Sequence, residues 1–144
     1  MDQDTLDTRF RLVSILWASL LWGVTLIAAM AFALSKGLLG AAPPPLLSPH
    51  MAATLLVLSP VLMAVGIAYR HGEVAPHDDP GRWLSAYQAR VILAAALQEA
   101  GALLGLVVCL LAGKPTWTLG VWGMAAAAMA FSRPRRDDLR RLTG

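Results

Sequence analysis

The stretch LVSILWASLLWGVTLIAAMAFAL at residues 12–34 decides the fold class, because it contains no charged side chain and is long enough to cross a lipid bilayer. An α-helix rises about 1.5 Å per residue, so about 20 apolar residues cover the roughly 30 Å of hydrocarbon in a membrane. Of the 144 residues, 57% are hydrophobic and only 15% are charged. In an average soluble domain about 25% are charged. The stretch and the composition together predict an integral membrane protein.

Three more apolar segments follow and predict a bundle of four transmembrane helices. The second and third are as long as a span requires, whereas the fourth is short and rich in alanine. This last segment crosses only if Thr116 and Ser132 lie at the two interfaces. We therefore predict an all-α, polytopic membrane protein in which residues 1–144 form a single four-helix domain, with spans at 12–34, 51–69, 90–111 and 116–132.

The basic residues are distributed unevenly among the segments that connect these spans. Lys36 and Lys114 follow the first and third spans, and every arginine lies on the opposite side of the predicted bundle. Cytoplasmic segments carry the excess of Lys and Arg, so this bias predicts cytoplasmic termini and a fourth segment that spans. We expect the bacterial inner membrane as the location. The arginines on the cytoplasmic side would be Arg9, Arg11, Arg70, Arg82, Arg90, Arg133, Arg135, Arg136, Arg140 and Arg141.

The arginines after the fourth span also indicate a partner. Near a membrane surface each would attract anionic headgroups by about 1 kcal/mol, and docking onto a cytoplasmic partner is the alternative. The net charge of +3 and the pI near 9.6 are compatible with nucleic-acid binding. However, the arginines adjoin the apolar segments, where they set topology. We expect a lipid bilayer as partner and no nucleic acid.

A cleaved signal peptide is the alternative interpretation of the first segment. The small-residue sequence AAMAFALS at residues 28–35 offers a cleavage site. Against this, the apolar core is about twice the usual 7–15 residues, and three aspartates occupy the region that should be basic: Asp2, Asp4 and Asp7. We therefore expect an uncleaved first helix.

Prolines mark two further features of the helices. Asp79 is a capping residue and Pro80 is favoured at the first helical position, so the third helix should begin near Pro80 and extend beyond the membrane. Trp83 and Tyr87, four residues apart, would then share a face at the level of the headgroups. Pro60, in the middle of the second span, removes a backbone hydrogen bond and predicts a kink, either a packing bend or a moving hinge.

The third span contains an acid, Glu99, within ALQEAGALLGLVVCLLAG at residues 96–113. A central acid costs roughly 2.5–3.5 kcal/mol of insertion free energy, which the Leu, Val and Ile residues of the segment offset. Helical spacing places Gln98 and Glu99 beside the small residues Ala94, Gly101 and Gly105, and the two glycines form a GxxxG step that lets backbones approach. We expect both polar side chains to face another helix rather than lipid. Their partners would come from another subunit or from Ser14, Ser19, Thr25, Thr54 and Ser59.

Residues 90–113 resemble the carboxylate-bearing outer helix of the proteolipid (c) subunits of rotary ATP synthases. In that family a Glu in an alanine-rich helix is followed six residues later by Gly and then by Leu-Val-Val or similar residues. Here these positions are Glu99, Gly105, Leu106, Val107 and Val108. The resemblance implies that Glu99 takes up and releases a proton. The glycine-rich inner helix and the polar loop of the family are missing from the chain.

Other residues able to carry chemistry predict neither an active site nor a metal site. The sequence HGEVAPHDD at residues 71–79 could hold a divalent metal, but its spacing matches no closed zinc motif, and we expect a solvated loop. His50, the remaining histidine, lies near an interface, and the single cysteine, Cys109, lies within an apolar segment. The chain contains no HExxH motif, no phosphate-binding glycine loop and no evident nucleophile–base pair. We expect no enzyme and no cofactor.

Two functions remain after this reasoning. The first is an accessory or scaffold subunit of a larger inner-membrane complex, or a homo-oligomer, held together by Gln98, Glu99 and the small-residue face. The second is a proton or cation carrier that uses Glu99. The connecting segments are too short for a receptor or catalytic domain, and a single acid is sparse for a transport pathway. We therefore predict an accessory subunit.

Overall fold

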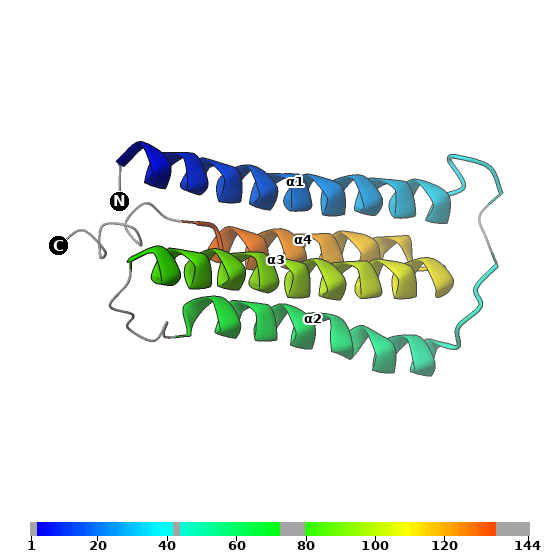
Figure 1. Cartoon of the computed structure of the whole chain (residues 1–144). Coiled ribbons are helices and arrows are strands. Elements are labelled where there is room, and N and C mark those ends of the chain that lie inside the picture. Colours follow the sequence, from blue (N-terminus) through cyan, green and yellow to red (C-terminus); the bar gives the residue numbers. More distant parts are fainter. Residues whose placement is uncertain (1–2, 42–43, 73–79, 135–144) are drawn as a thin grey trace.

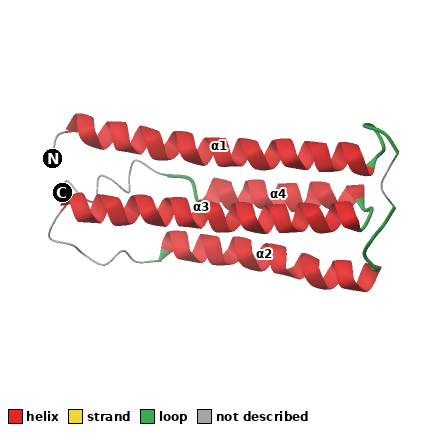
Figure 2. Ribbon diagram, turned by 45° about the vertical axis from the view of Figure 1, so that its right-hand side comes forward, coloured by secondary structure: helices red, strands yellow, loops and turns green. Residues whose placement is uncertain are grey.

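The computed structural model describes residues 3–41, 44–72 and 80–134, and these ranges contain four α-helices and no β-strand (Figure 2). Each helix covers one of the four segments predicted from the sequence, which confirms the all-α class. The helices are α1 (Gln3–Ser35), α2 (Pro49–His71), α3 (Pro80–Leu111) and α4 (Pro115–Phe131).

The four helices run alternately up and down the bundle (Figure 1). Helix α3 packs against all three others, α1 packs against α3 and α4, and α2 packs mainly against α3. The first residues of α1 and α3 and the last residues of α2 and α4 therefore lie at one end of the bundle (Figure 1). The connection between α3 and α4, residues 112–114, is short, as is usual for antiparallel neighbours.

Local sequence signals explain where the helices begin. Ser48 caps α2 by accepting a hydrogen bond from the backbone N–H of Met51 at 3.4 Å, and Pro49 follows it at the first helical position. Helix α3 begins at Pro80, as the sequence predicts. The expected capping residue, Asp79, lies outside the described residues. The connection between α1 and α2 contacts the C-terminal end of α3, where the backbone N–H of Leu46 donates to the carbonyl of Leu111 at 2.7 Å.

The surface of the bundle is apolar and its interior is built largely from small residues. Large side chains such as Trp22, Met30 and Val57 are more than half exposed, at 65%, 56% and 62%. By contrast, alanines such as Ala94 and Ala102 are fully buried at 0%. Large apolar side chains outside and small ones at helix contacts are typical of bundles in lipid, where there is no hydrophobic drive between helices.

Three of the helices are long and apolar enough to cross a membrane. They are Asp7–Ser35, Pro49–His71 and Gly81–Leu111, with mean hydropathies of 2.1, 2.2 and 2.1. Helix α4 has 17 residues and is shorter than these spans. The apolar helices and the apolar surface identify a small, all-helical integral membrane protein.

Glycines allow α2 to pack very closely against α3. A Cβ atom on Gly101 would lie 2.7 Å from the backbone oxygen of Ser59, and one on Gly66 would lie 2.8 Å from the backbone oxygen of Ala94. A Cβ on Gly105 would lie 2.7 Å from Ser59 Oγ and equally close to a side-chain carbon of α4. Such distances leave no room for a side chain, so the backbones touch where the predicted GxxxG step lies. Helix α2 continues through Pro60 without interruption, and the predicted kink stays a prediction.

Candidate functional site

Gln98 is buried where α3 meets α2 and the C-terminal end of α4. Its side chain is fully buried, and its Nε2 donates a hydrogen bond of 2.6 Å to Ser132 Oγ. Ser132 is the residue at which α4 ends, and its backbone N–H caps the helix by donating to the carbonyl of Ala128. Gln98 therefore ties α3 to the C-terminal end of α4.

Arg70, at the end of α2, also contacts Ser132. Its Nε donates to the backbone oxygen of Ser132 at 3.4 Å, and its terminal nitrogen donates to the hydroxyl of Tyr87 at 3.1 Å. The guanidinium also lies 5.0 Å from the centre of the Tyr87 ring, and Trp83 stacks on that ring at 5.4 Å with an interplanar angle of 9°. The predicted shared face of Trp83 and Tyr87 is thus confirmed. We call Arg70, Tyr87, Gln98 and Ser132 the polar junction.

Helix α1 is attached to α4 by two tryptophans. Trp17 Nε1 donates to the carbonyl of Met129 at 3.1 Å, next to the polar junction, and Trp122 Nε1 donates to Thr25 Oγ1 at 3.2 Å further along. A buried tryptophan N–H normally finds an acceptor, and here the acceptors come from the neighbouring helix. Polar contacts thus connect every helix of the bundle to at least one neighbour.

Two buried oxygens near these contacts retain unused hydrogen-bonding capacity. Ser59 Oγ, in the tight contact between α2 and α3, and Gln98 Oε1 have no hydrogen-bond partner among residues 3–41, 44–72 and 80–134. Both residues are fully buried. In an apolar interior an unpaired acceptor is unfavourable. Each of these two buried oxygens can therefore accept one further hydrogen bond.

Glu99 lies on a different side of α3 from Gln98. One face of the helix next to it is buried, with Ala95 at 2% and Ala102 at 0% exposure, whereas Ala96 and Ile92 on its other side are exposed. Glu99 itself is partly exposed, at the edge of the helix contact. No hydrogen bond or ion pair joins it to any other residue in the described part of the chain.

Gln98 is thus fully covered by neighbouring helices, whereas Glu99 is covered only in part within this chain. The reason is that successive residues on an α-helix point about 100° apart. When Gln98 faces α4, Glu99 is turned towards the outside. That Glu99 faces another helix or subunit stays a prediction. Three of the five hydroxyls expected as partners bond elsewhere: Ser19, Thr25 and Thr54 donate to carbonyls of their own helices at Ile15, Leu21 and His50.

The basic side chains of the described residues lie towards the two ends of the bundle, and most of them lie towards one end. Arg9, Arg11, Arg70, Arg82, Arg90 and Arg133 lie at the end where α1 begins and α4 ends, and Lys36 and Lys114 lie at the other. Arg90 also contacts α2, because its guanidinium donates to the carbonyl of Gly72 and lies 5.3 Å from the centre of the Tyr69 ring. The predicted headgroup residues Arg135, Arg136, Arg140 and Arg141 lie outside the described residues.

Metal-binding side chains do not gather in the described part of the chain, where no group of three or more His, Cys, Asp or Glu is close enough to hold an ion. The candidate loop at residues 73–79 lies outside these ranges. His71, which precedes it, is exposed at the end of α2.

The contacts of Ser132, Arg70 and Trp17 are not predicted by the sequence. From the sequence alone Ser132 is expected at an interface and Arg70 as a topology residue, because neither residue belongs to a chemical motif. A usable signal was present for Arg70: it ends a helix close in sequence to an aromatic pair, and arginine stacks readily on aromatic rings. The pairing of Gln98 with Ser132 depends on the packing of α3 against α4 and carries no sequence signal.

Comparison with known proteins adds no relative: no family model, no curated protein and no solved structure matches this chain. The resemblance of residues 90–113 to the proteolipid subunits of rotary ATP synthases consequently stays a prediction.

Proposed function

We propose that this protein is an accessory or scaffold subunit of a larger complex in the bacterial inner membrane, held there through the surface around Glu99. The observation that carries the proposal is the partial exposure of Glu99 without a polar partner in the described part of the chain. Glu99 belongs to a helix able to cross the membrane, is partly exposed on the outside of the bundle, and has no polar partner among the described residues.

The energetics of that position favour a partner outside the chain. An acid exposed to hydrocarbon near the bilayer centre costs roughly 2.5–3.5 kcal/mol on the insertion scale. A hydrogen-bond donor on a neighbouring protein would recover part of this cost, and interhelical hydrogen bonds in membranes contribute about 0.6 kcal/mol on average. The α3 surface that includes Ile92, Ala96 and Glu99 is the face to which such a partner would bind.

A second surface supports association with other proteins. Part of the outward face of α4 carries small residues: Gly120, Gly123 and Ala127 are all exposed, one helical turn apart. A Cβ atom on either glycine would meet nothing within 4 Å, so these glycines serve no packing within the chain. In membranes, small residues at this spacing let a second helix approach closely.

The proposal includes the topology. The described arginines lie at one end of the bundle, which by the positive-inside rule would be cytoplasmic. Both termini would lie on that side if α4 spans the membrane together with Thr116 and Ser132.

A proton or cation carrier is the second candidate, favoured by the same partly exposed position of Glu99. A carboxylate that exchanges protons with another subunit must be reachable from outside its own bundle, and Glu99 is reachable while Gln98 is not. In this proposal Glu99 binds and releases the ion, as the resemblance implies. The subunit proposal requires only that Glu99 accept or donate a hydrogen bond.

Three variants of one residue separate these candidates. Glu99→Gln retains hydrogen bonding and cannot ionise, Glu99→Asp retains the acid, and Glu99→Leu removes both properties. For a subunit, the complex copurified from native membranes should survive Glu99→Gln and be lost in Glu99→Leu. For a carrier, proton flux in liposomes should disappear in Glu99→Gln and be retained by Glu99→Asp. Copurification of the same partners by wild type and Glu99→Leu would refute the subunit proposal.

A further inference from the structure

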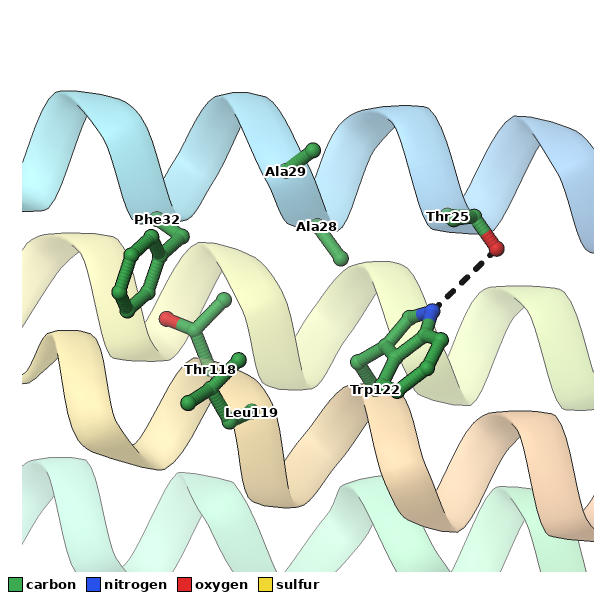
Figure 3. A pocket seen from close by; sticks show the side chains of 7 residues that line it. All are labelled: Thr25, Ala28, Ala29, Phe32, Thr118, Leu119 and Trp122. Carbon is green, nitrogen blue, oxygen red and sulfur yellow. Dashed lines mark hydrogen bonds between the residues drawn. The ribbon is translucent and has the colours of Figure 1, made fainter.

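A cleft opens on the outside of the bundle between α1 and α4, towards the end that carries the lysines. Its volume is about 230 Å³, and Figure 3 shows how its side chains lie. The rings of Phe32 and Trp122 stand at its two ends, and between them α1 contributes only the small side chains of Ala28 and Ala29. The cleft exists because these alanines leave space opposite the bulky residues of α4.

The lining of the cleft is apolar, and its polar groups are already engaged or covered. Trp122 Nε1 donates to Thr25 Oγ1 at 3.2 Å, so these two groups satisfy each other (Figure 3). Thr118 is 1% exposed, and its Oγ1, which has no hydrogen-bond partner among the described residues, is covered by the surrounding side chains. The surface that a ligand can reach is therefore apolar and fits a hydrocarbon chain. The volume is below the roughly 300–1,000 Å³ of pockets that enclose a drug-sized molecule, and suits part of one chain.

Both lysines of the protein lie one helical turn beyond this cleft. Lys36 follows Phe32 by four residues, about 6 Å along the axis, and its Nζ lies 5.9 Å from the centre of the Phe32 ring. Lys114 stands before the first residue of α4, four residues ahead of Thr118. Both are exposed. Packed helices have axes about 8–10 Å apart, so two lysines that flank the adjacent ends of α1 and α4 can approach the same phosphate.

We propose that this cleft and the two lysines form a binding site for an acidic phospholipid, with part of one acyl chain between Phe32 and Trp122 and the anionic headgroup between Lys36 and Lys114. The positive charges of the two lysines beside the apolar cleft favour an acidic lipid as the molecule bound there. A second copy of the chain would fill the apolar cleft and leave the lysines without a function, whereas an acidic lipid uses both features at once. The site is independent of Glu99, which lies on α3.

The test uses lipids with brominated acyl chains, which quench tryptophan fluorescence on contact. Subtracting the quenching of Trp122→Phe from that of the wild-type protein isolates the signal from the cleft. Bilayers of neutral phospholipid receive increasing mole fractions of brominated phosphatidylglycerol or brominated phosphatidylcholine. We expect half-maximal quenching of Trp122 at an about 30-fold lower mole fraction of the acidic lipid, the effect of about 1 kcal/mol from each of the two lysines near an anionic headgroup.

Four variants make the test specific. Lys36→Gln combined with Lys114→Gln should bring the acidic curve onto the neutral one, and Arg9→Gln, at the other end of the bundle, should not. Ala29→Leu fills the cleft and should reduce the quenching by both lipids, whereas Ala53→Leu, on the exposed face of α2, should not.

Two results would overturn the proposal. One is coincidence of the acidic and neutral curves in the wild-type protein, or a preference that persists without the lysines. The other is a fall in the quenching of Trp122 when the protein-to-lipid ratio is raised at constant lipid composition, which would show that a second copy covers the cleft.

Discussion

Replacing Gly101 by alanine should separate α2 from α3, because the added Cβ atom has no space. It would lie 2.7 Å from the backbone oxygen of Ser59 and 3.0 Å from Cγ of Met63. The side chain of Met63 can rotate, but the oxygen of Ser59 belongs to the α2 backbone and can move only with its helix. Gly123→Ala is the matched control, since a Cβ there meets nothing within 4 Å.

The difference between the two variants isolates the steric cost. Each replaces a helical glycine by alanine and gains about 1 kcal/mol of intrinsic helix preference, so this contribution cancels in the comparison. Overpacking of a well-packed site costs about 1–3 kcal/mol. We therefore expect the free energy of unfolding of Gly101→Ala to be about 1–3 kcal/mol lower than that of Gly123→Ala, and Gly123→Ala to be at least as stable as wild type.

The assay is reversible unfolding in mixed micelles of dodecyl maltoside and increasing mole fractions of sodium dodecyl sulfate. Tryptophan fluorescence and far-ultraviolet circular dichroism follow the transition, and agreement between them supports a two-state analysis. Equal unfolding midpoints for Gly101→Ala and Gly123→Ala would refute the close backbone contact between α2 and α3.

Two further predictions concern the polar junction and the topology. Ser132→Ala removes the acceptor of the Gln98 hydrogen bond, and in the same assay it should lower the free energy of unfolding by about 0.6–1.7 kcal/mol; an unchanged midpoint would show that the contact contributes nothing. In a Cys109→Ala background, cysteines placed at Arg9 and at Lys36 should react with a membrane-impermeant thiol reagent from opposite sides of the membrane. Labelling of both from the same side would contradict the proposed topology.

The fold follows closely from the sequence because its signals are local. Apolar segments without charge can be recognised residue by residue, and a proline or serine at a helix start acts on its immediate neighbours. The start of α3 at Pro80 and the stacking of Trp83 on Tyr87 are therefore predictable from spacing alone.

The candidate site is less predictable because it depends on the rotation of α3 about its own axis. Gln98 and Glu99 are adjacent, and both carry polar groups in an apolar helix, so the sequence does not distinguish the one that will be buried. The close contact of Gly101 and Gly105 with Ser59 fixes the rotation. Only then does Gln98 reach Ser132 while Glu99 turns to the outside.

The most direct test of the proposed function asks what covers the surface next to Glu99 in the native membrane. A photo-crosslinking amino acid at Ala96, exposed three residues before Glu99, should form an adduct with another protein when cells are irradiated. The same amino acid at Ala53, exposed on α2, serves as the control and should react with lipid. A protein adduct at residue 96 that disappears in Glu99→Leu is the predicted result. Adducts with lipid alone at both positions would contradict it.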